Sequence, residues 1–180
     1  DVRGISVRKV ANCIDIGTEY SGGGNNNGFY SVLERIECRN CITGIRSNVL
    51  LNNTILKKMK IGFASQCGIT LVDTDYTGTS ITESYFEACT LGIKALDTKL
   101  LNIEHCWFEQ NTSDIEIVKN HGIVNIEKNR FQSVQAVWMT IDLSEKSSIV
   151  SIKNNSILLR LTVEQRIEIR PNGYGSSPNP

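Results

Sequence analysis

Apolar and polar positions along this chain follow a pattern that returns every 22 to 26 residues. The clearest copies are residues 80–95 (SITESYFEACTLGIKA) and 102–117 (NIEHCWFEQNTSDIEI), which align at an offset of 22 residues. Two further copies follow at offsets of 23 and 26 residues. In all four copies one apolar residue follows another after five positions: Ile81 and Phe86, Ile103 and Phe108, Ile126 and Phe131, and Ile152 and Ile157. A repeat of this length indicates a solenoid, a propeller or a stacked array.

Each unit consists of short stretches in which apolar and polar residues alternate, which is the period of a β-strand. Residues that favour turns, mainly Ser, Asn, Lys and Asp, separate these stretches. The fixed Leu and Asn positions of a leucine-rich repeat are absent, and the unit is too short for a propeller blade. The pattern therefore predicts an all-β fold, a parallel β-helix of about seven coils with three short strands each. Equivalent residues of successive coils then stack at roughly 4.8 Å.

We expect the β-helix to span residues 1–170. Residues 171–180 contain all three prolines together with Gly and Ser, so we expect a tail or linker there. Because Asp1 already lies in a strand-like phrase, we interpret the chain as a fragment of a longer solenoid. The second coil, near residues 31–45, leaves two registers open. Either Ile36 or Cys38 takes the position of Phe86, and the first choice places Glu37 in the column of the glutamates that follow Phe86 and Phe108.

Composition narrows the classes of function. The 180 residues carry a formal net charge of zero, which argues against binding to nucleic acid or to an anionic membrane by charge alone. No apolar run approaches the roughly 18 residues of a membrane span, so we expect no membrane insertion. The six cysteines fit best as small reduced core residues. Cys38 and Cys41 lack a second pair or a histidine at zinc-site spacing, so we expect no metal and no cofactor.

Three phrases carry a resemblance to a known family: residues 36–45 (IECRNCITGI), 126–131 (IEKNRF) and 152–157 (IKNNSI). They resemble the pectate-lyase-type right-handed parallel β-helices, and the Gly-Ile strand starts and Asn-rich turns resemble bacteriophage tailspikes. The resemblance covers roughly Gly4 to Ile169. It implies right-handed coils, a homotrimer on the phage tail or otherwise outside the cell, and a bacterial surface polysaccharide (capsule or O-antigen) as partner. Many members cleave this polysaccharide, but no catalytic signature of the family matches here.

The outward residues of the two central coils form the best candidate site. If Phe86 and its equivalent in the next coil point inward, Tyr85 stacks beside Trp107 and Glu87 beside Glu109 on the outside. Aromatic rings can cover the apolar face of a pyranose while carboxylates accept its hydroxyl groups. Carboxylates roughly 5 Å apart also suit a retaining glycosidase, so Glu87 and Glu109 are candidate acid and nucleophile. The alternative is a solvated glutamate column, with the two aromatic residues buried against a neighbouring subunit.

A second outward column contains Lys94 and Glu116, with Trp138 or Thr140 in the next coil. We include Lys94, Glu116 and Trp138 among the candidate carbohydrate contacts, although a cross-strand ion pair explains Lys94 and Glu116 as well. Asp114 lies at the edge of this column and could form an acid pair with Glu109 across the turn.

Three functions stay open at this point. The first is a tailspike β-helix that binds, and in its enzymatic form depolymerises, a bacterial polysaccharide. The second is a non-catalytic structural or adhesive β-solenoid on a virion or cell surface. The third is a bacterial polysaccharide lyase or glycoside hydrolase with no connection to phage. Exposed aromatics beside close carboxylates favour the first, whereas aromatics buried at a subunit interface favour the second.

Overall fold

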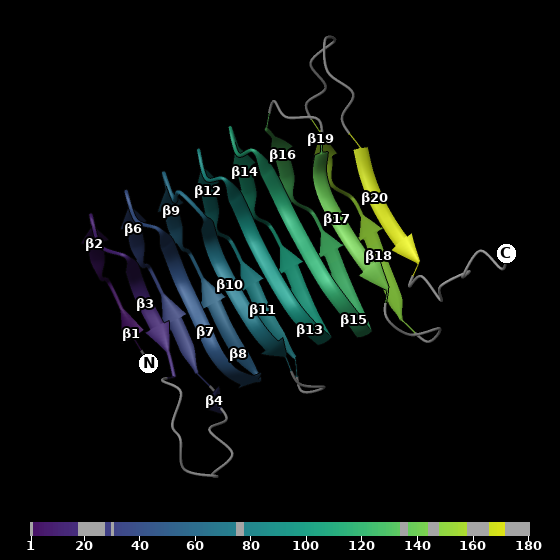
Figure 1. Cartoon of the computed structure of the whole chain (residues 1–180), viewed down its shortest axis with the longest axis horizontal. Coiled ribbons are helices and arrows are strands. Elements are labelled where there is room, and N and C mark those ends of the chain that lie inside the picture. Colours follow the sequence, from purple (N-terminus) through teal and green to yellow (C-terminus); the bar gives the residue numbers. More distant parts are fainter. Residues whose placement is uncertain are drawn as a thin grey trace, which may run out of the picture.

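The computed structural model describes residues 2–17, 28–29, 31–74, 78–133, 137–143, 148–157 and 166–171. Among these residues the regular structure is β-strand, and every strand pairing is parallel. Figure 1 shows the strands of successive coils side by side, from the purple N-terminal end to the yellow C-terminal end. The chain is therefore a parallel β-helix, as the repeat predicts.

The strand bounds follow the repeat. In chain order they are β1 (Val2–Arg3), β2 (Ser6–Arg8), β3 (Asn12–Ile16), β4 (Gly28–Phe29), β5 (Val32–Glu34), β6 (Glu37–Arg39), β7 (Thr43–Asn52), β8 (Thr54–Lys57), β9 (Lys60–Gly62), β10 (Cys67–Thr74), β11 (Thr79–Thr82), β12 (Tyr85–Glu87), β13 (Leu91–Glu104), β14 (Trp107–Glu109), β15 (Ser113–Glu127), β16 (Arg130–Gln132), β17 (Val137–Leu143), β18 (Ile149–Lys153), β19 (Ser156–Ile157) and β20 (Arg166–Pro171).

Two sheets make up the wall of the solenoid. Seven strands of two or three residues form one sheet, in the order β19-β16-β14-β12-β9-β6-β2. The other thirteen strands of the described residues form the second sheet, which covers the other two sides of each coil. The two sides are joined because β13 and β15, of 14 and 15 residues, continue through the corner between them.

This continuity corrects the expectation of three short strands in every coil. Asp97 in β13 and Lys119 in β15 adopt positive φ angles of 55° and 57°. A single residue in this left-handed conformation turns the chain without an intervening loop. The β13–β15 pairing continues on both sides of the bend, with a register shift between Thr98 and Leu100.

The core follows the predicted columns. Phe86 pairs with Phe108, and Phe108 pairs with Phe131, in adjacent strands of the seven-stranded sheet. Neighbouring rings are stacked with centroids 5.0 Å apart and interplanar angles of 9° and 10°. All three rings are buried. Offset stacking of this kind stabilises a core beyond the area it buries.

The same column settles the number of coils and the open register. Cys38 pairs with Ile61, which pairs with Phe86, so Cys38 and not Ile36 continues the column. Only the five middle members are buried: Cys38, Ile61, Phe86, Phe108 and Phe131. The terminal members, Val7 and Ile157, are partly exposed. The solenoid thus has about five closed turns with a buried member in this column, fewer than the seven expected. The two end coils stay partly exposed because each lacks a neighbour on one side.

The corner that leads into the seven-stranded sheet uses one left-handed residue in each coil. These residues are Gly4, Arg35, Lys58, Glu83, His105, Lys128 and Asn154. In the later coils an asparagine follows and bonds to the coil before it. The Asn129 side chain accepts a hydrogen bond from the Cys106 backbone at 2.8 Å and donates one to the Ile103 carbonyl at 2.9 Å. Asn155 repeats the arrangement one coil later. These side chains satisfy buried backbone groups that a corner would otherwise leave unpaired.

The tail predicted at residues 171–180 lies outside the described residues except for Pro171, which ends β20.

Candidate functional site

The candidate site lies on the outward side of β12 and β14. Tyr85 pairs with Trp107 and Glu87 with Glu109 across these adjacent strands. Because side chains alternate along a strand, the inward Phe of each strand forces its two neighbours outward. We call these four side chains the aromatic–carboxylate face. The structure brings them together as the offset of 22 residues predicts.

The two aromatic rings contact each other edge to face. The centroids of Tyr85 and Trp107 lie 5.3 Å apart, with an interplanar angle of 66°. Trp107 remains 37% exposed. On its other side the guanidinium carbon of Arg130 lies 4.5 Å from the ring centroid, within cation–π distance. Trp107 is therefore held between two neighbouring strands while one part of its surface stays open to a ligand.

Both carboxylates of this face have a partner. The Tyr85 hydroxyl donates a hydrogen bond to Oε2 of Glu109 at 2.7 Å. Burial, and then this hydrogen bond, raise the pKa of Tyr85, so the hydroxyl stays protonated and keeps donating well above neutral pH. Oε2 of Glu87 lies 3.7 Å from Nη2 of Arg39, two strands away. The face therefore presents an ordered array of donors and acceptors around one aromatic surface.

Asp114 lies in a different environment from the glutamates. Its side chain is fully buried and accepts hydrogen bonds from Ser133 Oγ at 2.6 Å and from Asn111 Nδ2 at 3.0 Å. Burial is the main cause that raises the pKa of Asp114 to about 6, and the two hydrogen bonds oppose it. Glu109, in contrast, faces outward. The structure therefore does not bring Asp114 and Glu109 together as an accessible acid pair.

The second predicted column lies on the neighbouring side of the solenoid. Nζ of Lys94 is 3.2 Å from Oε2 of Glu116, and both side chains are 35% exposed. The residue in register with Glu116 on β17 is Thr140. Trp138 also belongs to β17, but its side chain lies outside the described part of the structure.

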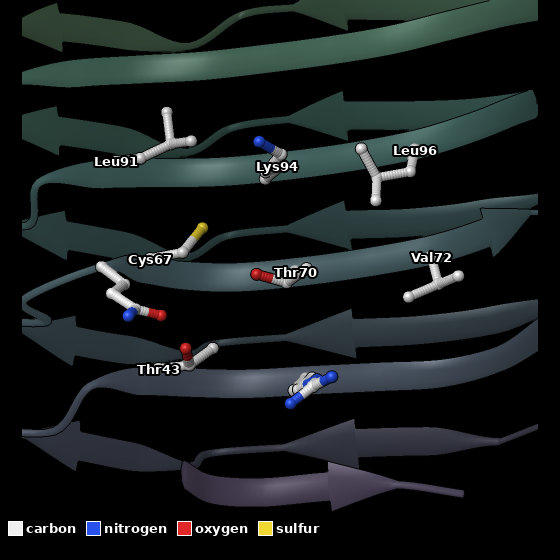
Figure 2. Close-up of a pocket in the computed structure, with 9 residues that line it drawn as sticks. Thr43, Cys67, Thr70, Val72, Leu91, Lys94 and Leu96 are labelled. Atoms are coloured by element: carbon white, nitrogen blue, oxygen red, sulfur yellow. The ribbon is translucent and has the colours of Figure 1, made fainter. Parts of the chain in front are cut away.

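A groove of about 440 Å³ lies beside this ion pair, on the outward side of β7, β10 and β13. Figure 2 shows its side chains in rows along the three strands, with Thr70 between Lys94 and the strand below. Its lining includes the short side chains Cys67 and Thr70 on β10 and the longer Leu91, Lys94 and Leu96 on β13. We call this feature the β10 groove.

Sequence reasoning missed three arginines that shape these faces. Arg130 follows Trp107 by 23 residues, and Arg39 belongs to the column of Glu87. Arg46 lies one strand from Thr70 in the β10 groove. The repeat offset alone identifies Arg130, whereas Arg39 and Arg46 required the register of the second coil.

The buried cysteines do not contribute a reactive group to either face. All six cysteines are free thiols, and all but Cys13 are buried. Burial raises the pKa of Cys67 and Cys89 to about 11 and that of Cys41 and Cys106 to about 12. Thiols with such pKa values are poor nucleophiles at neutral pH.

Among the described residues, no group of three or more His, Cys, Asp or Glu side chains is arranged to hold a metal ion. Within that part of the chain no helix is long and apolar enough to cross a membrane. Comparison with protein-family models, with curated proteins and with solved structures found no match. The fold and the two faces described above are therefore the basis for a functional proposal.

Proposed function

We propose that this β-helix binds a polysaccharide on the aromatic–carboxylate face. The observation that supports this is Trp107, which stays 37% exposed although Tyr85 and Arg130 hold it on either side. A ring fixed in this way loses little conformational freedom when a sugar stacks on it. Glu109 and Glu87 lie within one strand spacing and supply acceptors for sugar hydroxyl groups.

Binding fits the geometry better than hydrolysis does. A retaining glycosidase needs a protonated acid beside a free nucleophilic carboxylate. Here Glu109 accepts a hydrogen bond from Tyr85, and Glu87 lies beside Arg39. Both carboxylates are thus held by partners on the outward surface, which favours a binding face over an acid and nucleophile pair.

Depolymerisation is the second candidate, because the adjacent register of Glu87 and Glu109 is compatible with the carboxylate spacing of a retaining enzyme. Glu87→Gln and Glu109→Gln are assayed separately for new reducing ends and for absorbance from unsaturated sugars. An enzyme of this kind loses activity in both variants. Undiminished cleavage in both removes the pair from consideration.

The wider context follows from the tailspike resemblance: a homotrimer on a virion or otherwise outside the cell, with a capsule or O-antigen of a bacterial host as ligand. Light scattering of the purified chain tests the trimer. A trimer in which Trp107 becomes fully protected from acrylamide quenching supports the structural or adhesive alternative, because its aromatic face is then covered by a subunit.

The proposed binding is tested by titrating the protein with a panel of bacterial capsular and O-antigen polysaccharides in isothermal titration calorimetry, whose signal does not depend on Trp107. We expect Trp107→Ala to weaken binding roughly two- to tenfold, since an aromatic contact contributes about 0.5–1.5 kcal/mol. Ile149→Ala, which truncates a 56% exposed residue on another side, is the control and should bind normally. Unchanged affinity in Trp107→Ala rejects this face as the binding surface.

A further inference from the structure

The β10 groove combines positive charge with apolar ends. Arg46, Thr70 and Lys94 occupy one row across β7, β10 and β13, in direct register. Thr70 is short and lies between the two long cationic side chains in this row, and all three residues line the groove. Leu91 and Leu96 lie on either side of Lys94 along β13.

This arrangement suits an anionic group that has neutral or apolar neighbours. Strands lie roughly 4.8 Å apart, so an anion above Thr70 is within reach of cationic groups from both adjacent strands. The Thr70 hydroxyl, which is in hydrogen-bond contact with the Cys67 side chain, is a further polar group between the two cations. The leucine side chains supply apolar contact on either side of the charge. The volume of about 440 Å³ falls within the usual range of ligand pockets.

We propose that the β10 groove binds a carboxylate group, carried either by a uronic acid residue within a glycan or by a free organic acid. The site is on a different side of the solenoid from Trp107 and does not depend on the function proposed above. A carboxylate is favoured because the planar guanidinium of Arg46 can bind both of its oxygens at once.

The ion pair next to the groove makes the proposal testable in two directions. Lys94 already lies 3.2 Å from Glu116, so a ligand carboxylate must compete with this side chain for the same ammonium group. Removing the charge of Glu116 is therefore expected to strengthen ligand binding, whereas removing that of Lys94 weakens it. A purely structural role for the pair does not predict a gain in affinity from Glu116→Gln.

Isothermal titration calorimetry at low salt uses three probes: a hexasaccharide with alternating glucuronate and N-acetylglucosamine residues, its methyl ester, and free glucuronate. We expect Arg46→Gln and Lys94→Gln to lower affinity for the acidic probe at least tenfold and Glu116→Gln to raise it several-fold. Binding weakens as salt is added, because these charges are partly exposed. The charge-matched controls are Lys153→Gln and Glu127→Gln, which lie on the third side. Thermal melts confirm that each variant is folded.

Equal binding of the methyl ester, or an affinity that none of the three variants changes, overturns the proposal. So does a Glu116→Gln protein that binds no more tightly than the wild type. If free glucuronate binds as tightly as the hexasaccharide, the groove is a site for small organic acids. If only the hexasaccharide binds, the groove is a glycan-binding site. Trp107→Ala is expected to keep its affinity for free glucuronate, so this proposal and the one above can fail separately.

Discussion

The buried carboxyl of Asp114 should make the stability of this fold depend on pH in a specific way. Burial raises the pKa of Asp114 from 3.8 to about 6 in the folded chain. Its Oδ2 atom is buried without a hydrogen-bond partner among the described residues, whereas Oδ1 has two. The ionised form is therefore poorly accommodated, and we expect the Asp114→Asn variant to be relatively more stable at high pH than at low pH.

The magnitude follows from linkage between protonation and folding. Below pH 3.8 the side chain is protonated in both the folded and unfolded states, so this group does not oppose folding. As the pH rises through 3.8 toward 6, the unfolded chain releases the proton first and the folded state loses stability. At 1.36 kcal/mol per pH unit, the rise from 3.8 to about 6 corresponds to about 3 kcal/mol above pH 6. About 2 kcal/mol of this loss falls between pH 4.5 and 7.5.

Urea unfolding of both proteins at pH 4.5 and 7.5 measures the effect. The free energy of unfolding of Asp114→Asn minus that of the wild type should increase by about 2 kcal/mol between these two pH values. Ser133→Ala removes a hydrogen bond that lowers the pKa of Asp114, so it should enlarge the pH dependence of the wild type. A difference between Asp114→Asn and wild type that stays constant with pH would refute the reasoning, because the aspartate would then titrate alike in both states.

Three further predictions concern the core. Phe108→Ala should lower the free energy of unfolding by about 3–5 kcal/mol in urea titrations, because the Phe108 ring is buried. Phe63 is 46% exposed, so Phe63→Ala should change this free energy by less than about 0.5 kcal/mol. Similar losses in the two variants would contradict the stacked core. A Cβ at Gly92 would meet a backbone oxygen at 2.6 Å, so Gly92→Ala should lower the free energy of unfolding by about 1–3 kcal/mol. The control Gly62→Ala should be tolerated, because its Cβ would have its nearest contact at 3.7 Å. Equal melting temperatures of the two variants would argue against this packing. At pH 8 a thiol-specific disulfide reagent should modify only Cys13 in the native protein, and rapid modification of all six thiols would disprove their burial.

The sequence predicts the fold well because the stacking rule acts on every coil. Once two coils pair in register, one offset determines which side chains meet, and the pairs Ile81 with Ile103 and Phe86 with Phe108 follow directly. The weaker second coil shows the limit of this reasoning. Ile36 and Cys38 are both apolar and two residues apart, so the alternation of strands cannot choose between them.

The candidate site was predictable only where the repeat is strict. Tyr85 and Trp107 lie in the two clearest copies, and their contact follows from the offset. The repeat alone does not predict the burial of Asp114, because a carboxylate ordinarily faces solvent. The alignment of the coils does carry a signal that Asp114 is buried. Asp114-Ile115 matches Gly68-Ile69 and Gly92-Ile93, so Asp114 continues a column of glycines where successive coils approach closely. A volume such as the β10 groove depends on the relative lengths of side chains on three strands, which no single repeat reveals.

The central claim is that residues 22 to 26 positions apart lie directly above one another. Nuclear Overhauser contacts between selectively labelled phenylalanine rings test it most directly. The account predicts cross-peaks from the Phe108 ring to the rings of both Phe86 and Phe131, because each pair of centroids is 5.0 Å apart. A folded protein in which Phe108 contacts neither ring would contradict the stacked solenoid and with it both proposed binding faces.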